Sequence, residues 1–270
     1  MNVFEIHDPT LNEDGTDRIV GYLFYFERAR RFYVELMDGL DEWDAPALFM
    51  RHAREGRYSV DSEWSMKWVR QRIIPPDRQN LGSILKENGL KYYDEYRLLV
   101  LSEGRCAQDE AYIRRCTPED LPPGIRDRLK RKVRDVMPLA ENRLLVFFRD
   151  DAARLIDAEA LLKEDPAFAR VLSDPELFAR VSVSPGGNSV EWDEARSIPA
   201  ERLYRTGRKS PILYADLLSF TDRRLVDTAG ACEILGVSRQ YISQLIRQDR
   251  LHPVISTPGT QIFLRGELEA

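Results

Sequence analysis

The sequence predicts an α+β fold for a mixed multi-domain chain, with two small α+β units followed by a C-terminal unit of two short helices and a β-hairpin. Runs of aromatic and β-branched residues, which suit strands, alternate with short stretches of helical spacing. Pro-Gly and Gly-Gly pairs mark turns between such runs. Near the C-terminal end, two apolar stripes of helical spacing flank Gly236, a residue type that can end a helix in the left-handed conformation.

We expect the first α+β domain at residues 1–131. Its predicted strands are Ile19–Phe26, Arg31–Leu36, Tyr96–Leu101 and Ala111–Arg115, and its predicted helices run from Ala45 to Glu55, from Asp61 to Ile73 and from Asp77 to Gly89. Trp64 and Trp68 stand among basic residues and could stack on bases, but a spacing of four favours a place in the core. The basic segment Arg126–Arg134 predicts a surface helix that joins two domains, with a nucleic-acid contact as the alternative.

The second α+β unit is expected at residues 132–207. A β-meander of Val133–Pro138, Asn142–Phe148 and Ala153–Asp157 is followed by short helical pieces, one of them capped by Asp174 with proline in its first turn. Val181–Val183 and Ser189–Trp192 predict a hairpin around Pro185–Asn188, and a helix from Pro199 to Tyr204 closes the unit. We expect a linker at residues 208–222 and the last domain at 223–270.

The second unit resembles a bacterial family of small α+β domains of unknown function (DUF). The residues that carry the resemblance are Arg143–Phe148, Asp174–Val181, Gly186-Gly187, Trp192, Ile198 and Leu203-Tyr204. The resemblance implies a binding or antitoxin-like protein, sometimes encoded beside a toxin-like partner and sometimes attached to a helix-turn-helix. It transfers no catalytic residue.

In the last domain, Asp227 or Thr228 can cap a first helix, whose apolar stripe includes Ile234. Ser238 is a good N-cap for a second helix, with Ile242, Leu245 and Ile246 facing inward. Arg and Gln side chains on the opposite face can read guanine and adenine edges bidentately. The outward residues are Arg239, Gln240, Tyr241, Ser243, Gln244 and Arg247.

A second hairpin follows, because Pro258-Gly259 separates two apolar β-branched runs. With Cys232–Arg239, Leu245-Ile246 and Arg250-Leu251, this segment resembles the winged helix-turn-helix of the excisionase and MerR-like DNA-binding families. The resemblance covers Leu225 to the C-terminus and implies that the second helix enters a DNA major groove. The predicted DNA-binding residues are Ser238, Arg239, Gln240, Tyr241, Ser243, Gln244, Arg247, and, in the wing, Thr257 and Thr260.

Charge favours an alternative in which this domain docks on protein. Between Asp222 and Ala270, six basic side chains are balanced by six acidic ones, whereas phosphate attraction supplies much of the affinity for DNA. A neutral module needs a dimer partner or a second basic patch. We expect no coiled coil of the MerR type after Leu268, so the resemblance does not extend to symmetric operator binding.

The whole chain carries a net charge of −5, which is ordinary for a soluble protein. No apolar run is long enough to span a membrane, and Met1–Glu5 lacks the basic start of a leader. Three cysteines form no disulfide framework. We therefore expect a cytoplasmic protein that does not enter membranes.

Motifs for catalysis and metal binding were sought and not found. The three histidines form no zinc or nucleophile pattern, and Gly186-Gly187 lacks the Lys-Ser/Thr of a phosphate loop. Asp41-Glu42-Trp43-Asp44 could bind a cation, but acids in loops are usually solvated. We expect no enzymatic activity, no cofactor and no metal.

These observations predict a DNA-binding protein, a transcriptional regulator that reads the major groove. Its expected partners are double-stranded DNA, a toxin-like protein and a second copy of the chain as a homodimer. The alternative is a protein-binding adaptor or antitoxin-like module that acts through the middle domain.

Overall fold

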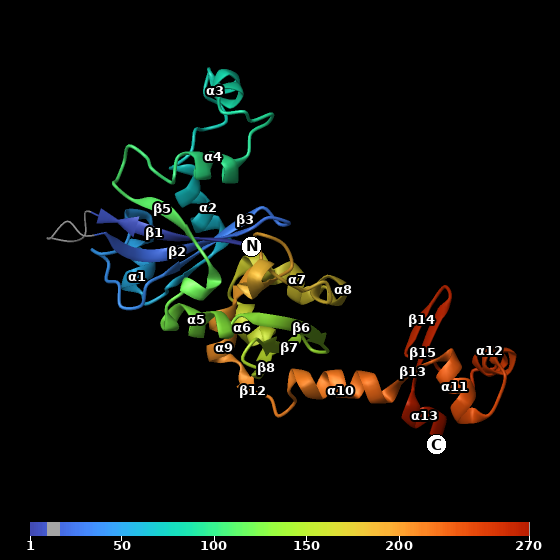
Figure 1. Ribbon diagram of the computed structural model, residues 1–270. Coiled ribbons are helices and arrows are strands. Elements are labelled where there is room, and N and C mark those ends of the chain that lie inside the picture. The colour runs from blue at the N-terminus through green and yellow to red at the C-terminus, as the bar shows by residue number, and fades with distance from the viewer. Residues whose placement is uncertain (10–16, 270) are drawn as a thin grey trace. The chain divides into compact units, whose positions relative to one another are not determined.

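The computed structural model describes residues 1–9 and 17–269 (Figure 1). It confirms the predicted α+β class, because helices of at most eleven residues are combined with small antiparallel sheets. The chain divides into two compact units, one formed by residues 1–150 and 156–207 and the other by residues 151–155 and 208–270. Each unit is described by itself.

The first unit begins with a five-stranded sheet of order β4-β3-β2-β1-β5, antiparallel throughout. Its strands are β1 (Asn2–Asp8), β2 (Arg18–Phe26), β3 (Arg31–Leu36), β4 (Ser59–Val60) and β5 (Tyr112–Cys116). The predicted pairing of the two aromatic runs is confirmed by β2 and β3, which set Phe24 opposite Tyr33. Strand β1, which pairs with β2 and β5, was not predicted from the sequence.

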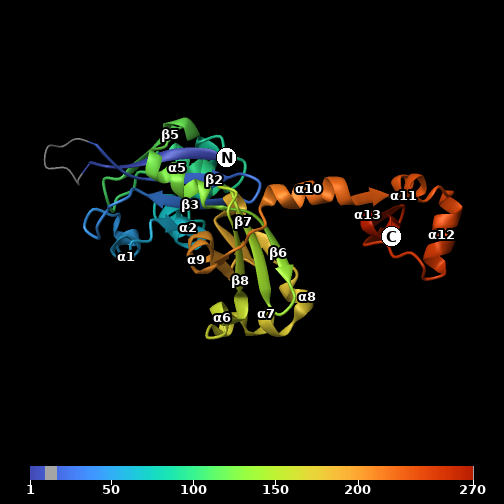
Figure 2. The same ribbon diagram turned by 90° about the horizontal axis from the view of Figure 1, so that it is seen from below.

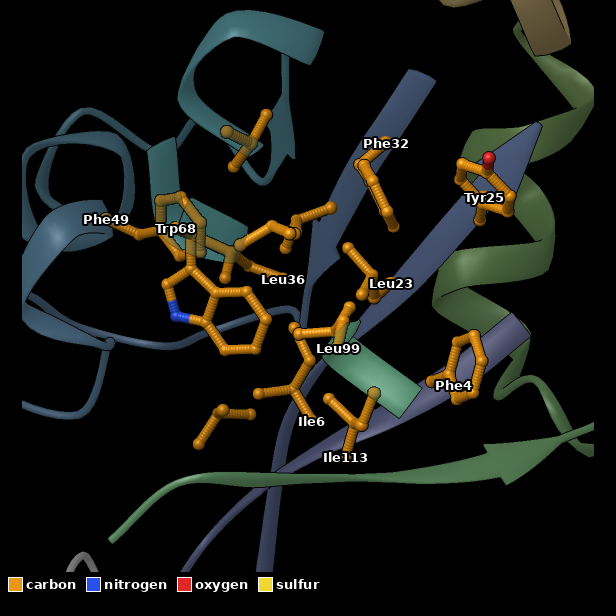
Figure 3. Packing of buried hydrophobic residues seen from close by; sticks show 14 of the residues in the cluster. Phe4, Ile6, Leu23, Tyr25, Phe32, Leu36, Phe49, Trp68, Leu99 and Ile113 are labelled. Atoms are coloured by element: carbon orange, nitrogen blue, oxygen red, sulfur yellow. The ribbon is translucent and has the colours of Figure 1, made fainter. Parts of the chain in front are cut away.

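Helices cover both faces of this sheet. They are η2 (Ala47–Phe49), α1 (Met50–Arg54), α2 (Ser62–Arg70), α3 (Leu81–Glu87), α4 (Glu95–Leu101), η3 (Pro118–Asp120) and α5 (Pro123–Lys130). Phe4 and Ile6 of β1 join the core under α2 and α4 (Figure 3), whereas Val3 joins a second core with Ile125 of α5. Because successive side chains of a strand point to opposite faces, burial of both faces explains the nearly unbroken apolar runs.

The expected strand Tyr96–Leu101 is wrong, since these residues form helix α4. The Asp94 side chain accepts a hydrogen bond from the backbone N–H of Arg97 at 3.0 Å and so caps the first turn. Leu98 and Leu99 are then buried, while Val100 and Leu101 are exposed. The β-propensity of the apolar run is a weak preference that the cap and this one-sided burial outweigh.

The two tryptophans of α2 differ in their surroundings. Trp68 is 1% exposed, and the Arg72 guanidinium lies 3.9 Å from its ring centroid, which confirms the expected place in the core. Trp64 stays 37% exposed with the Lys67 ammonium over its ring. The buried ring of Trp68 cannot stack on a base without unfolding the core.

The remainder of the first unit follows the expected meander and hairpin. Its strands are β6 (Val133–Leu139), β7 (Arg143–Phe148), β9 (Ser182–Val183), β10 (Ser189–Glu191) and β11 (Ser197–Pro199), and β8 (Ala153–Asp157) ends in it. Its helices are α6 (Ala158–Leu162), η4 (Pro166–Phe168), α7 (Ala169–Ser173), α8 (Pro175–Phe178), η5 (Pro185–Gly187) and α9 (Ala200–Thr206). Figure 2 shows α6, α7 and α8 gathered at one end of β6 and β7, where Asn142 donates to the Leu172 carbonyl at 2.9 Å.

A buried carboxylate connects this part to the first sheet. Glu35 of β3 accepts hydrogen bonds from the Lys132 ammonium, from Arg128 Nε at 3.0 Å and from Ser59 Oγ at 2.7 Å. Burial alone would raise the pKa of Glu35, but the two cations outweigh it and hold the pKa below its ordinary value. The most basic segment of the chain therefore directs two of its charges inward.

A second connection lies at the β9–β10 hairpin. Arg31 of β3 donates to both oxygens of Glu191, at 2.9 and 2.7 Å. Close by in the hairpin, a Cβ atom on Gly187 would overlap the backbone carbonyl of Val133, and its φ of 74° is left-handed. The Gly-Gly pair that marks a turn in the sequence thus also permits the hairpin to lie against β6.

The second unit contains the pairing of β8 with β12 (Arg208–Lys209), helix α10 (Tyr214–Arg224) and the C-terminal elements. These elements are β13 (Leu225–Asp227), α11 (Thr228–Leu235), α12 (Arg239–Arg247), β14 (Ile255–Thr257), β15 (Thr260–Leu264) and α13 (Arg265–Glu269). The stretch 208–222, for which the sequence suggests a linker, thus holds a short strand and most of an eleven-residue helix. Among the described residues, no helix combines the length and apolar character needed to cross a bilayer.

Replacing Glu35 by glutamine should destabilise the first unit. Breaking a buried ion pair from one side typically costs about 3–5 kcal/mol, because it leaves the partner cation uncompensated. Since the folded pKa of Glu35 is lowered, its contribution is present above the ordinary value of 4.5 and is lost as pH falls through the folded pKa. Urea unfolding should therefore show a large deficit at neutral pH that narrows on acidification.

The control is Glu55→Gln, which removes an exposed carboxylate paired with Arg51 and Arg57. Exposed pairs contribute about 0–1 kcal/mol, so this change should have little effect. Equal losses of stability in both variants would contradict the role given to Glu35.

Candidate nucleic-acid interface

The candidate interface is built on the turn between α11 and α12. Asp227 caps α11 by accepting from the Gly230 N–H at 2.9 Å, which resolves the choice between Asp227 and Thr228. Gly236 ends the helix at φ 66° and ψ 31°, a left-handed conformation that glycine adopts without a steric penalty. Ser238 then caps α12 by accepting from the Tyr241 N–H at 3.3 Å. Two caps and one glycine therefore fix where the second helix begins.

One face of α12 belongs to the core of the C-terminal segment. Ile242 is fully buried, and Leu245 and Ile246 pack against the same cluster, as their helical spacing predicts. The buried members of this cluster are Ala231, Ile242, Leu251, Phe263 and Leu268. Because α12 is held through these side chains, its opposite face is presented by a helix that has little freedom to rotate.

All six residues predicted to face outward on α12 are exposed, and so are the three further predicted residues, Ser238, Thr257 and Thr260. Their polar groups are not equally available. Ser238 serves as the cap, Ser243 Oγ donates to the Arg239 carbonyl at 3.1 Å, and Arg247 Nε donates to the Ser243 carbonyl at 3.2 Å. Arg239, Gln240 and Gln244 form no side-chain hydrogen bond with any residue that the structure describes, so these three can bind a ligand without breaking a contact.

The predicted hairpin is formed by β14 and β15, which pair antiparallel with Thr257 opposite Thr260. Pro258 and Gly259 make the two-residue turn. Thr257 Oγ1 donates across this turn to the Thr260 carbonyl at 3.5 Å, so its hydroxyl stabilises the hairpin. On its other side, β15 pairs with β13, giving a three-stranded sheet of order β13-β15-β14.

The balanced charge of this segment is unevenly distributed. Three of its acidic side chains have local partners: Asp227 caps α11, Asp249 contacts His252 at 3.0 Å, and Glu269 pairs with Arg265 at 2.7 Å and Arg224 at 3.6 Å. The side chain of Arg265 holds the pKa of Glu269 below its ordinary value. Helix α12 itself contains no acidic residue. Its arginines therefore face solvent without an acid on the same helix.

Arg250 was not among the site residues predicted from the sequence. It is exposed beyond the end of α12, and its backbone N–H donates to the Leu245 carbonyl at 2.9 Å, which ties it to the helix. The signal was present in the sequence, because Arg250 follows Arg247 by three residues. Two surface residues were also missed: Val254, just before β14, and Ile255, its first residue, are both 48% exposed.

The acidic loop considered as a cation site has other partners. Asp41 Oδ1 accepts from the backbone N–H groups of Trp43 and Asp44, Asp44 pairs with Arg18 at 2.7 Å, and Glu42 lies 3.6 Å from Arg54. Within residues 1–9 and 17–269, no group of three or more His, Cys, Asp or Glu side chains has an arrangement suited to a metal ion. The exposed face of α12 is therefore the strongest candidate for a functional site.

Comparison with protein families gives a match to the middle of the chain. Residues 133–209 match a family described as a protein of unknown function, DUF2442. This confirms the part of the sequence analysis that placed a domain of unknown function at Val133 to Tyr204. The matched residues run from the first residue of β6 to the last residue of β12, so they end before α10 and the C-terminal helices.

Two further comparisons add little. A search of curated proteins gave no match. Among solved structures, the chain is similar to a crystal structure from Nitrosomonas europaea ATCC 19718 that is provisionally named a DNA-binding protein, at 27% identity over 46% of this chain and 79% of that one. The TM-score is 0.25, which does not establish a shared fold.

Replacing Gly236 by alanine should destabilise the α11–α12 turn. A side chain in the left-handed conformation costs roughly 1–2 kcal/mol, although the space around the Cβ position is open. Hydrogen exchange of the full chain should show faster exchange in α11 and α12. Gly82→Ala is the matched control, because Gly82 lies within helix α3 with open space around it, and there alanine should be neutral or stabilising. Unchanged exchange in α11 and α12 would contradict the role of the turn.

Proposed function

We propose that the chain is a DNA-binding protein and not an enzyme, and that α12 reads the major groove through Arg239, Gln240 and Gln244. The observation that carries the proposal is that these side chains are exposed on one rigid helix and are not engaged by the described residues. Arg is suited to guanine and Gln to adenine, each through two hydrogen bonds. A helix held by caps and a packed inner face can deliver such groups in a fixed register.

The hairpin of β14 and β15 supports the same proposal. In a winged helix-turn-helix it would approach the phosphate backbone or the minor groove beside the helix, with Thr257 and Thr260 at its tip. Their hydroxyl and backbone groups can contact phosphate, which positions a protein on the duplex without reading its sequence. We propose that the chain acts in this way as a transcriptional regulator.

Charge limits the strength of this binding. The affinity gained from phosphates grows with the number of cationic contacts. A segment with balanced charge should therefore bind DNA weakly. Its affinity should fall steeply with rising salt concentration only if several arginines contact phosphate. Arg247 and Arg250, at and just beyond the end of α12, are placed for this role. We therefore expect modest affinity for one copy of the interface.

The first test uses the full chain and a random pool of duplexes, from which preferred sequences are selected. Replacing Arg239 and Gln240 together by alanine should abolish the preference in a gel-shift, since each bidentate pair contributes about 1–3 kcal/mol of discrimination. The control replaces exposed residues of the same types in the first unit, Arg28 and Gln108. A preference that survives the α12 substitutions would show that the groove assignment is wrong.

The second test separates phosphate contact from base reading. Arg250→Ala should weaken binding to all sequences about equally and reduce the slope of log affinity against log salt by about 1, because one cation is lost. Titrations of preferred and scrambled duplexes at several salt concentrations measure this. A loss confined to the preferred duplex would instead place Arg250 on a base.

A second proposed function is that of a protein-binding adaptor or antitoxin-like module acting through residues 132–207. The balanced charge of the C-terminal segment favours it. The hairpin side chain of Glu191 is already engaged by Arg31 of the same chain, so capture of a toxin-like partner should be tried with the full chain. Capture that persists when DNA binding is abolished would favour this function over the regulator.

A further inference from the structure

We propose that helix α10 is a self-association surface that pairs antiparallel with α10 of a second copy of the chain. The helix spans Tyr214–Arg224 and has no buried residue. The helix and the two residues before it expose large apolar side chains to solvent. Ile212, Leu213, Leu218 and Phe220 are 49%, 43%, 53% and 50% exposed. Four such residues within nine positions form an apolar concentration that scattered surface residues do not.

Three apolar residues of α10 share one face. Leu213, Leu217 and Phe220 follow the spacing of four and three at which residues of a helix lie above one another, whereas Leu218 lies about a quarter turn further round the helix. The opposite face carries Ala215, Ser219 and Asp222. This division predicts a helix that packs through one side, as in a short two-helix seam.

The charges beside this face identify the occupant. Asp216 and Arg223 are seven residues apart, so they lie along the same edge of the apolar stripe, one near each end of the helix. When two copies of α10 pair antiparallel, Asp216 of one copy comes level with Arg223 of the other, and the reverse contact forms at the far end. Such reciprocity is what a two-fold interface requires, because the same patch must complement itself.

Both charged side chains are available for this contact. Arg223 is exposed and forms no ion pair with the part of the chain that the structure describes. Asp216 Oδ2 accepts from the Leu213 N–H at 2.9 Å, which caps the helix and leaves its other oxygen free to accept from an arginine. The surface is therefore formed before the second copy arrives.

The C-terminal end of α10 is attached to the candidate interface within the same unit. Arg224 lies 3.6 Å from Glu269 of α13, and Leu225 continues directly into β13, which pairs with β15. A two-fold axis through α10 would thus relate two copies of α12. This consequence rests on the proposed DNA binding, whereas self-association is measured without DNA and stands or falls separately.

The experiment is sedimentation equilibrium of the full chain. The wild-type chain should show a monomer–dimer equilibrium, and Phe220→Ser should raise the dimer dissociation constant by at least roughly tenfold, because an aromatic anchor is lost from the seam. Ala215→Ser, on the opposite face, should leave the constant unchanged. A wild-type chain that stays monomeric at all concentrations overturns the proposal.

Charge reversal tests the antiparallel arrangement. Asp216→Arg and Arg223→Asp should each weaken self-association roughly tenfold, because each places like charges at both ends of the pair. An equimolar mixture of the two variants should associate about as well as the wild-type chain, since both ends then join opposite charges. Asp216→Asn keeps an oxygen for the cap and should have a smaller effect than Asp216→Arg.

Three further results would overturn the inference. A mixture that associates no better than the separate variants would exclude the antiparallel pairing. A dimer unaffected by Phe220→Ser would show that another surface dimerises. A monomer in which Phe220→Ser speeds hydrogen exchange in residues 1–150 would show that the chain itself covers α10.

Discussion

The first unit depends on one buried carboxylate, that of Glu35. Its oxygens join three segments: its own strand β3, helix α5 through Arg128, and the start of the second α+β part through Lys132. A charge in the interior is tolerated only where cations and hydroxyls satisfy it, and here the neighbours do so well enough to lower its pKa. This constraint explains why most of the segment that matches the family, residues 133–150 and 156–207, lies in one compact unit with the sheet that precedes it. The matched residues form a self-contained pattern of strands and helices, but one of their hairpins and the residue before them are engaged by β3.

In the second unit the corresponding constraint is conformational. Gly236 takes the left-handed conformation that ends α11 and is followed two residues later by Ser238, which caps α12. Once α12 starts there, Ile242 must point into the cluster with Phe263, and the residues between the apolar positions must point to solvent. The proposed reading of DNA therefore follows from a turn that contains no nucleic-acid contact of its own.

Local signals predicted most elements, and their failures have physical causes. Asp174 and Ser238 were predicted as caps, because a short polar side chain before an apolar stripe commonly caps a helix. Tyr96–Leu101 failed because an apolar run lacks a period that separates strand from helix, and the deciding cap at Asp94 lies outside it. In contrast, the outward residues of α12 could be predicted from spacing alone. The inward turn of Arg128 could not, because it depends on Glu35, ninety-three positions earlier in the chain.

The position of each charged side chain decides how the balanced charge of the C-terminal segment bears on DNA binding. A net charge is a sum over side chains and says nothing of where each one lies, whereas a groove is contacted by one face. Glu269 is held by Arg265 and Arg224, Asp249 contacts His252, and α12 itself contains no acidic residue. Arg239 and Arg247 then remain as the charges of that face, which is enough to orient a helix in a groove but few for tight binding. Pairing with a second copy doubles the number of such contacts, although each chain keeps the same number of basic residues. For this reason a chain with acidic net charge and a neutral reading module has more to gain from pairing than a strongly basic one.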